Sequence, residues 1–147
     1  MGDGFILIED DVLSSLLDFR QQGPMAPEAG GILIGFRRGV HLHVTHATMP
    51  GSLDRRSRFE FQRLDPIHQR TASKLWERSR ETADYIGEWH THPQVQPSPS
   101  SIDRREWGMI TRAKSAPMIF AILGLQDWWI GIGQRKRLAV ATQISQQ

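Results

Sequence analysis

The sequence contains no cysteine among its 147 residues. This absence excludes disulfide bonds, a thiol nucleophile and any metal site that depends on thiolate ligands. A bound metal ion would have to be held by histidine, aspartate or glutamate. A catalytic nucleophile would have to be a hydroxyl, a carboxylate or a metal-activated water.

Long hydrophobic runs are also missing. The longest, Met118–Leu123, is far too short to cross a bilayer. The first residues lack the basic start and the extended apolar segment of a secretory signal. We therefore expect a cytoplasmic protein without a membrane partner.

There is little excess charge of either sign, since the formal net charge is +2. Hydrophobic residues make up 39% and charged residues 23%, which is an ordinary globular balance that suits one domain over residues 1–147. Basic clusters occur at residues 55–58, 104–105 and 135–137. Such clusters are more typical of solvated surface than of a phosphate-binding face, so we do not expect a nucleic-acid partner.

The hydrophobic periodicity predicts a mixed α/β (α+β) domain in which helices pack on a sheet. Helices are expected at residues 9–22, 66–82 and 101–114, and the second should bury Ile67, Ala72, Leu75 and Trp76. Strands are expected at residues 31–36, 40–46, 83–92, 118–123, 128–133 and 138–144. Residues 49–65 contain proline, glycine and several arginines, which indicates a long irregular loop.

The most informative stretch is residues 87–103, GEWHTHPQVQPSPSSID. His90 and His92 lie two residues apart, so on a strand both side chains point to the same face. Asp103 follows at the start of the next expected helix and can return to supply an oxygen ligand. Two nitrogens, one oxygen and an open fourth position are typical of a catalytic zinc site. For an isolated His-x-His pair, simple hydrogen bonding would be the better interpretation.

Two further residues, Ser100 and Glu28, are candidates for the remaining parts of the chemistry. Ser100 and Asp103 have the spacing of a capping box, which would hold Asp103 rigidly at a helix start. Glu28 stands just before the glycine-containing strand pattern. A zinc-activated water needs a proton acceptor that can later protonate a leaving amine, and glutamate can serve. Taken alone, Glu28 would be an ordinary loop acid.

Three segments together carry a family resemblance: EAGGILIG at residues 28–35, HTHP at 90–93 and SSID at 100–103. In order and spacing they resemble the JAMM (JAB/MPN+) metalloprotease family, and the compact chain resembles its stand-alone prokaryotic branch. The resemblance implies an MPN/JAB-type central mixed β-sheet packed by helices, with cytidine-deaminase-like layering. It also implies one zinc ion, held by His90, His92 and Asp103.

The same resemblance implies the activity. Glu28 would move the proton of the attacking water, and Ser100 would stabilise the oxyanion. The substrate would be a protein with a flexible C-terminal tail, either a ubiquitin-like protein or a conjugated CD-NTase, since the motifs look particularly like peptidases of CBASS-type anti-phage operons. Alternatives are an enzyme that trims sulfur-carrier ubiquitin-like precursors and a metal-holding binding scaffold without turnover. A metal-dependent nuclease, prompted only by the arginine clusters, is a more distant one.

The surroundings of the motif give further expectations. Glu88 shares the strand face of His90, so we expect it to orient a histidine or to meet substrate, although it could also compete as a ligand. Trp107 on the motif helix and the loop at residues 49–65 are candidate walls of a substrate groove. His41, His43 and His46 form a looser cluster, which we interpret as surface or packing residues.

Overall fold

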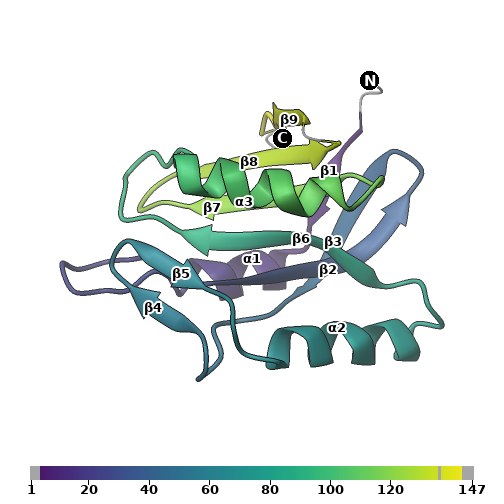
Figure 1. The fold of residues 1–147 in the computed structure, drawn as a ribbon, viewed down its shortest axis with the longest axis horizontal. Coiled ribbons are helices and arrows are strands. Elements are labelled where there is room, and N and C mark those ends of the chain that lie inside the picture. The colour runs from purple at the N-terminus through teal and green to yellow at the C-terminus, as the bar shows by residue number, and fades with distance from the viewer. Residues whose placement is uncertain (1–3, 136, 144–147) are drawn as a thin grey trace.

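The computed structural model describes residues 4–135 and 137–143. Within them, a curved sheet of mixed strand direction has the order β1-β3-β2-β6-β7-β8-β9 (Figure 1). β1 runs parallel to β3 and β6 parallel to β7, while the other neighbours are antiparallel. The strands are β1 (Ile6–Ile8), β2 (Gly30–Arg38), β3 (His41–Ala47), β6 (Asp84–Thr91), β7 (Met118–Leu123), β8 (Trp128–Gln134) and β9 (Arg137–Val140).

Helices cover both faces of this sheet. α1 (Asp10–Leu17) lies behind it in Figure 1, while α2 (Ile67–Arg78) and α3 (Ser101–Arg112) lie on the opposite side. Leu16 of α1 belongs to the same core cluster as Trp89 of β6, and Trp107 of α3 packs with Phe120 of β7. The predicted α/β class, with helices packed on a mixed sheet, is confirmed.

Strand β7 shows why the sheet needs helices on both sides. All of its residues are buried, and alternate side chains enter the two opposite core clusters. A short, wholly apolar run is the expected pattern for a strand that is covered on both faces. The strand beside it, β6, therefore runs through the middle of the molecule and carries the histidine motif to the edge of the core.

The segment predicted as an irregular loop, residues 49–65, was interpreted wrongly. It contains a two-stranded hairpin of β4 (Arg55–Ser57) and β5 (Glu60–Gln62), separate from the main sheet. β1 was also missed. These strands are three residues long, and those of the hairpin are largely exposed, so no hydrophobic alternation marks them.

The first helix is shorter than predicted, since it ends at Leu17 rather than near residue 22. Beyond it the chain turns so that the ring of Phe19 packs beside Trp89, with ring centroids 5.9 Å apart. The strand expected at residues 138–144 ends at Val140, and residue 144 lies outside the described residues.

The predicted apolar face of the second helix is partly wrong. Ile67 and Trp76 are 40% and 39% exposed, whereas His68 and Ala72 are buried. His68 is accepted in the interior because both of its ring nitrogens have hydrogen-bond partners. No helix among the described residues is both long and apolar enough to span a membrane.

Candidate metal centre

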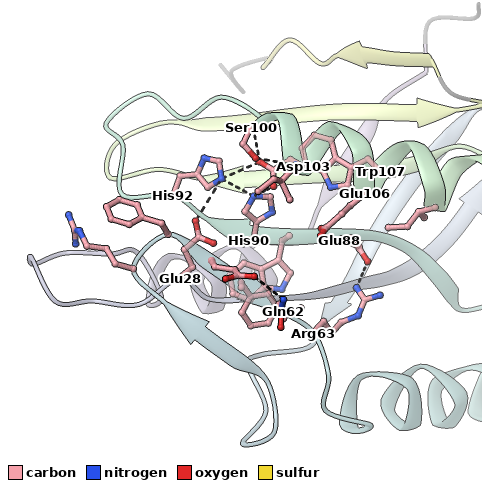
Figure 2. A pocket seen from close by; sticks show the side chains of 18 of the residues that line it. Glu28, Gln62, Arg63, Glu88, His90, His92, Ser100, Asp103, Glu106 and Trp107 are labelled. Atoms are coloured by element: carbon pink, nitrogen blue, oxygen red, sulfur yellow. Dashed lines mark hydrogen bonds and ion pairs between the residues drawn. The ribbon is translucent and has the colours of Figure 1, made fainter.

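At the end of β6, the side chains of the two motif histidines converge on one point. His90 and His92 lie on the same face of the strand, and their Nε2 atoms are 3.0 Å apart (Figure 2). Thr91 between them points to the opposite face, where it is fully buried. Strand alternation therefore separates the ligand-type side chains from the side chain that anchors the strand.

The start of α3 supplies the third group. Ser100 Oγ accepts the backbone N–H of Asp103 at 3.0 Å, and Asp103 Oδ2 accepts the backbone N–H of Ser100 at 2.8 Å. The capping box predicted from the sequence is therefore present. It leaves Asp103 Oδ1 3.3 Å from His90 Nε2 and Oδ2 3.3 Å from His92 Nε2.

These three side chains fit a metal ion. One ligand atom from each of His90, His92 and Asp103 can be chosen so that all lie within 4.8 Å of one another. Two imidazole nitrogens and one carboxylate oxygen suit zinc and related divalent ions better than calcium or magnesium, which prefer oxygen-rich sites. The three side chains would therefore supply three ligands to such an ion.

Glu28 lies beside this group. The residue comes just before β2, is buried, and places its Oε1 atom 3.9 Å from His92 Nε2. Its backbone is fixed by the hairpin, because its N–H donates to Ser57 O at 2.7 Å and its carbonyl accepts from Arg56 Nε at 2.8 Å. The carboxylate is therefore held next to the ligand atoms without being one of the converging three.

Burial raises the pKa of Glu28 to about 7; the charge of His92 lowers it, while those of Asp103 and Glu60 raise it. A carboxylate with a pKa near neutrality can both take up and release a proton at physiological pH. A cation bound beside it would favour the ionised, proton-accepting form.

The charges of the ligand-type residues stabilise one another. Burial alone would raise the pKa of Asp103, but hydrogen bonds from His90 and His92 outweigh it and hold that pKa well below its usual range. Burial likewise opposes the charged form of His92, yet the hydrogen bond and charge of Asp103 raise its pKa. The carboxylate is therefore ionised, as metal coordination requires.

We call His90, His92 and Asp103 the metal-type group. This group lies in a groove with two distinct walls. The β4–β5 hairpin and the residues after it form one wall, with Phe59 and Leu64 largely exposed. α3 forms the other, with Ile102 and Met109 exposed and Trp107 buried at its base. The sequence expectation that residues 49–65 and the motif helix flank a groove is therefore correct in placement.

Glu88 does not orient either histidine, and that part of the prediction is wrong. Its carboxylate pairs with Arg63 and accepts the hydroxyl of Tyr85 at 2.8 Å. A register shift in the pairing of β2 with β6 puts Tyr85 on the same face as Glu88, although the two are three residues apart. Arg63 and Tyr85 were not found by sequence reasoning, because nothing local signals that the hairpin segment folds back onto β6.

The second histidine cluster lies apart from the groove. His41 Nδ1 accepts the backbone N–H of Phe5 at 3.0 Å, and His43 Nε2 lies 2.9 Å from Glu9 Oε1. Both are surface and packing contacts at the β1–β3 edge, as the sequence indicated. Sequence reasoning did not anticipate Glu9 as the partner, since it precedes His43 by 34 positions.

The curved mixed sheet thus carries a group of two histidines and one aspartate, with a buried glutamate beside it. The chain belongs to the family described as prokaryotic homologs of the JAB domain, which matches residues 10–131. The family resemblance inferred from the three sequence motifs is thereby confirmed.

The names of individual relatives indicate which class of enzyme the chain resembles. A Vibrio cholerae protein named "CD-NTase/cGAS isopeptidase" is 39% identical over 142 residues, which cover 97% of this chain and 90% of that protein. An Escherichia coli protein of the same name is 42% identical, covering 88% and 82%. A Sinorhizobium fredii protein named "Probable metalloprotease y4qB" is 30% identical, covering 77% and 74%. The protein is a hydrolase of the peptidase class.

A solved structure supports the fold. The solution structure of a Desulfitobacterium hafniense protein superposes with a TM-score of 0.67 at 23% identity, covering 92% of this chain and 89% of that one. Because the identity is low, this similarity concerns the arrangement of the elements alone.

Proposed function

We propose that this protein is a zinc-dependent isopeptidase that acts in the cytoplasm and releases a CD-NTase from proteins to which its C-terminal tail is conjugated. The observation that carries the proposal is the convergence of His90, His92 and Asp103 beside the buried carboxylate of Glu28. The proposed substrate is supported by relatives that are named "CD-NTase/cGAS isopeptidase" and align over most of both chains.

His90, His92 and Asp103 would hold the zinc ion through two nitrogens and one oxygen. When bound there, a zinc ion would supply Lewis-acid chemistry for amide hydrolysis. Glu28 accepts the proton of the attacking water and delivers it to the nitrogen of the leaving amine. Its pKa near neutrality and its fixed backbone suit both transfers.

Ser100 is the proposed donor to the oxyanion. Its Oγ atom accepts the N–H of Asp103 through a lone pair, so the hydroxyl hydrogen itself remains available to donate. Ser100 lines the groove next to the ligand-type residues. A neutral donor held by a helix cap is preorganised for charge that develops only during the reaction.

The groove is the proposed path of the substrate tail. Exposed apolar side chains on both walls, among them Phe59 and Met109, can contact an extended peptide that leads to the scissile amide. A flexible tail can also pair its backbone with an exposed strand, which would fix its register. Both features favour a protein substrate.

The placement of Glu28 also bears on the alternative functions. A scaffold that only holds metal has no use for a buried proton acceptor beside the ligands, so this arrangement favours turnover. Trimming of sulfur-carrier precursors would use the same chemistry on a different tail. The names of the relatives favour the CD-NTase substrate over that alternative.

The test combines zinc content with cleavage of a fusion that joins the C-terminal tail of a CD-NTase to a reporter protein. We expect about one zinc per chain in the wild type and in Glu28→Ala, with cleavage at the junction in the wild type only. Glu77→Ala, which removes an exposed glutamate on α2, is the matched control and should cleave normally. Zinc without cleavage would reject the substrate, and absence of zinc would reject the mechanism.

A further inference from the structure

Gln21 is a buried polar residue outside the groove. It lies in the segment after α1, is 2% exposed, and belongs to the side of the sheet opposite the two histidines. Its amide nitrogen donates to Ala26 O at 3.0 Å and to Arg58 O at 2.8 Å, and its Oε1 atom accepts the hydroxyl of Thr91 at 3.0 Å. A buried carboxamide with both amide hydrogens and its oxygen engaged is strongly fixed in orientation.

Thr91 is the link to the metal-type group. It is fully buried between His90 and His92, and its Oγ1 atom accepts the backbone N–H of Ala29 at 2.9 Å. Its own N–H donates to Ala29 O, also at 2.9 Å. The residue between the two histidines therefore binds both polar backbone groups of the residue that follows Glu28.

The result is that the short segment carrying Glu28 is held at both ends by one network. Gln21 binds Ala26 directly and reaches Ala29 through the Thr91 hydroxyl. The third contact, to Arg58 O, joins the turn of the β4–β5 hairpin to the same amide. Gln21 thus connects the proposed proton carrier, the strand of the histidines and one wall of the groove.

We infer that Gln21 is a positioning residue, which acts from the back of the sheet through Thr91 and fixes Glu28 relative to His90 and His92. This inference rests on the proposed function for its consequence in catalysis. The physical reason is distance: Glu28 must reach both the attacking water and the leaving amine, and a displacement of about 1 Å in such an arrangement can cost on the order of 100-fold in rate.

The test compares Gln21→Met with Thr91→Val and Thr91→Ser. Methionine has a similar length and removes all three hydrogen bonds, valine removes only the Thr91 hydroxyl, and serine keeps it. We expect kcat to fall by about 10- to 100-fold in Gln21→Met and Thr91→Val, with zinc retained, and to recover to within about 3-fold of wild type in Thr91→Ser.

Thr111→Val is the matched control, because it removes another buried hydroxyl, whose hydrogen bond stays within α3. It should leave kcat within about 2-fold of wild type, although its thermal stability falls. If it reduces kcat as much as Thr91→Val does, general destabilisation explains the losses and the positioning role is rejected.

A second readout needs no catalytic activity. Amide hydrogen exchange should be about 10-fold faster at Ala29 in Thr91→Val, and faster across residues 26–29 in Gln21→Met. If the wild type does not cleave the fusion, the proposed substrate fails while these exchange rates still decide whether Gln21 fixes the segment. Unchanged exchange, or wild-type kcat in Gln21→Met, would overturn the inference.

Discussion

Within residues 4–135 and 137–143, two clusters combine histidine with aspartate, and they differ in how their polar atoms are used. At the end of β6, the Nε2 atoms of His90 and His92 and the carboxylate of Asp103 converge on one point in an open groove. In the second cluster, His68 of α2 lies between Asp54 and Thr48 in a linear chain whose imidazole and carboxylate are almost wholly excluded from solvent.

The linear chain satisfies its own members. Thr48 Oγ1 accepts the backbone N–H of Ile32, so its hydrogen is free to donate to His68 Nδ1, which leaves Nε2–H to donate to Asp54 Oδ2 at 2.6 Å. Asp54 also accepts backbone N–H groups of the loop that carries the hairpin. In the open cluster, two imidazole nitrogens and a carboxylate oxygen instead converge on one point of the groove, where a metal ion can bind. Convergence and access, rather than residue type, distinguish a candidate metal centre from a structural relay.

The largest effect is expected from variants that remove a residue of the open cluster. His90→Ala or Asp103→Ala should lose both zinc and activity, because each removes a ligand, whereas Glu28→Ala should lose activity alone. Incubation with a chelator should reproduce the loss in the wild type, and added zinc should restore it. Metal analysis and cleavage assays on the same samples check this, and equal zinc loss in all three variants would contradict the assigned roles.

The next largest effect is expected from a variant that interrupts the linear chain of Thr48, His68 and Asp54. Asp54→Ala leaves His68 and several backbone N–H groups without their acceptor in the interior, so we expect a loss of roughly 3–5 kcal/mol in the free energy of unfolding. Zinc content should stay near one per chain in the fraction that remains folded. Urea unfolding followed by fluorescence measures the loss, and a change below about 1 kcal/mol would show that the relay is not structural.

The pH dependence of stability sharpens the comparison. Burial would raise the pKa of Asp54, but hydrogen bonds from Asp65, His68, Gly51 and Leu64 outweigh it and lower that pKa below its ordinary value. A depressed carboxyl pKa stabilises the fold above the unfolded-state pKa of about 4, and this contribution is lost as the pH falls below that value. Thermal unfolding between pH 2 and 6 should therefore show a steeper acid loss in the wild type than in Asp54→Asn.

The smallest effect is expected at the partly buried Arg63–Glu88 pair beside the groove. Glu88→Gln keeps the shape of the side chain but weakens its attraction to Arg63, so stability should change by no more than about 1 kcal/mol. Zinc content should be unchanged, because Glu88 contacts neither histidine among the described residues. A measured KM that differs from wild type while kcat stays constant would place Glu88 in substrate binding, and loss of zinc would restore the ligand interpretation.

Much of the fold could be predicted from the sequence because the patterns that indicate its elements are local. The apolar run of β7, the alternation in β3, and the capping box at Ser100 each depend on neighbours within a few positions. The hairpin of β4 and β5 was missed because its short strands are exposed and are held by distant partners. Contacts such as Gln21 with Arg58, 37 positions apart, leave no pattern in either segment.

By itself, the sequence determined which residues are candidates to bind metal and move a proton. Donor type and strand spacing, which are properties of the chain, pointed to His90, His92 and Asp103, and the family resemblance added Glu28 and Ser100. Only the tertiary structure decided that Glu88 turns to Arg63, that His68 is enclosed, and that Gln21 lies behind the histidines. Those outcomes depend on which segments fold against one another, and burial and hydrogen-bond partners exist only after that packing has formed.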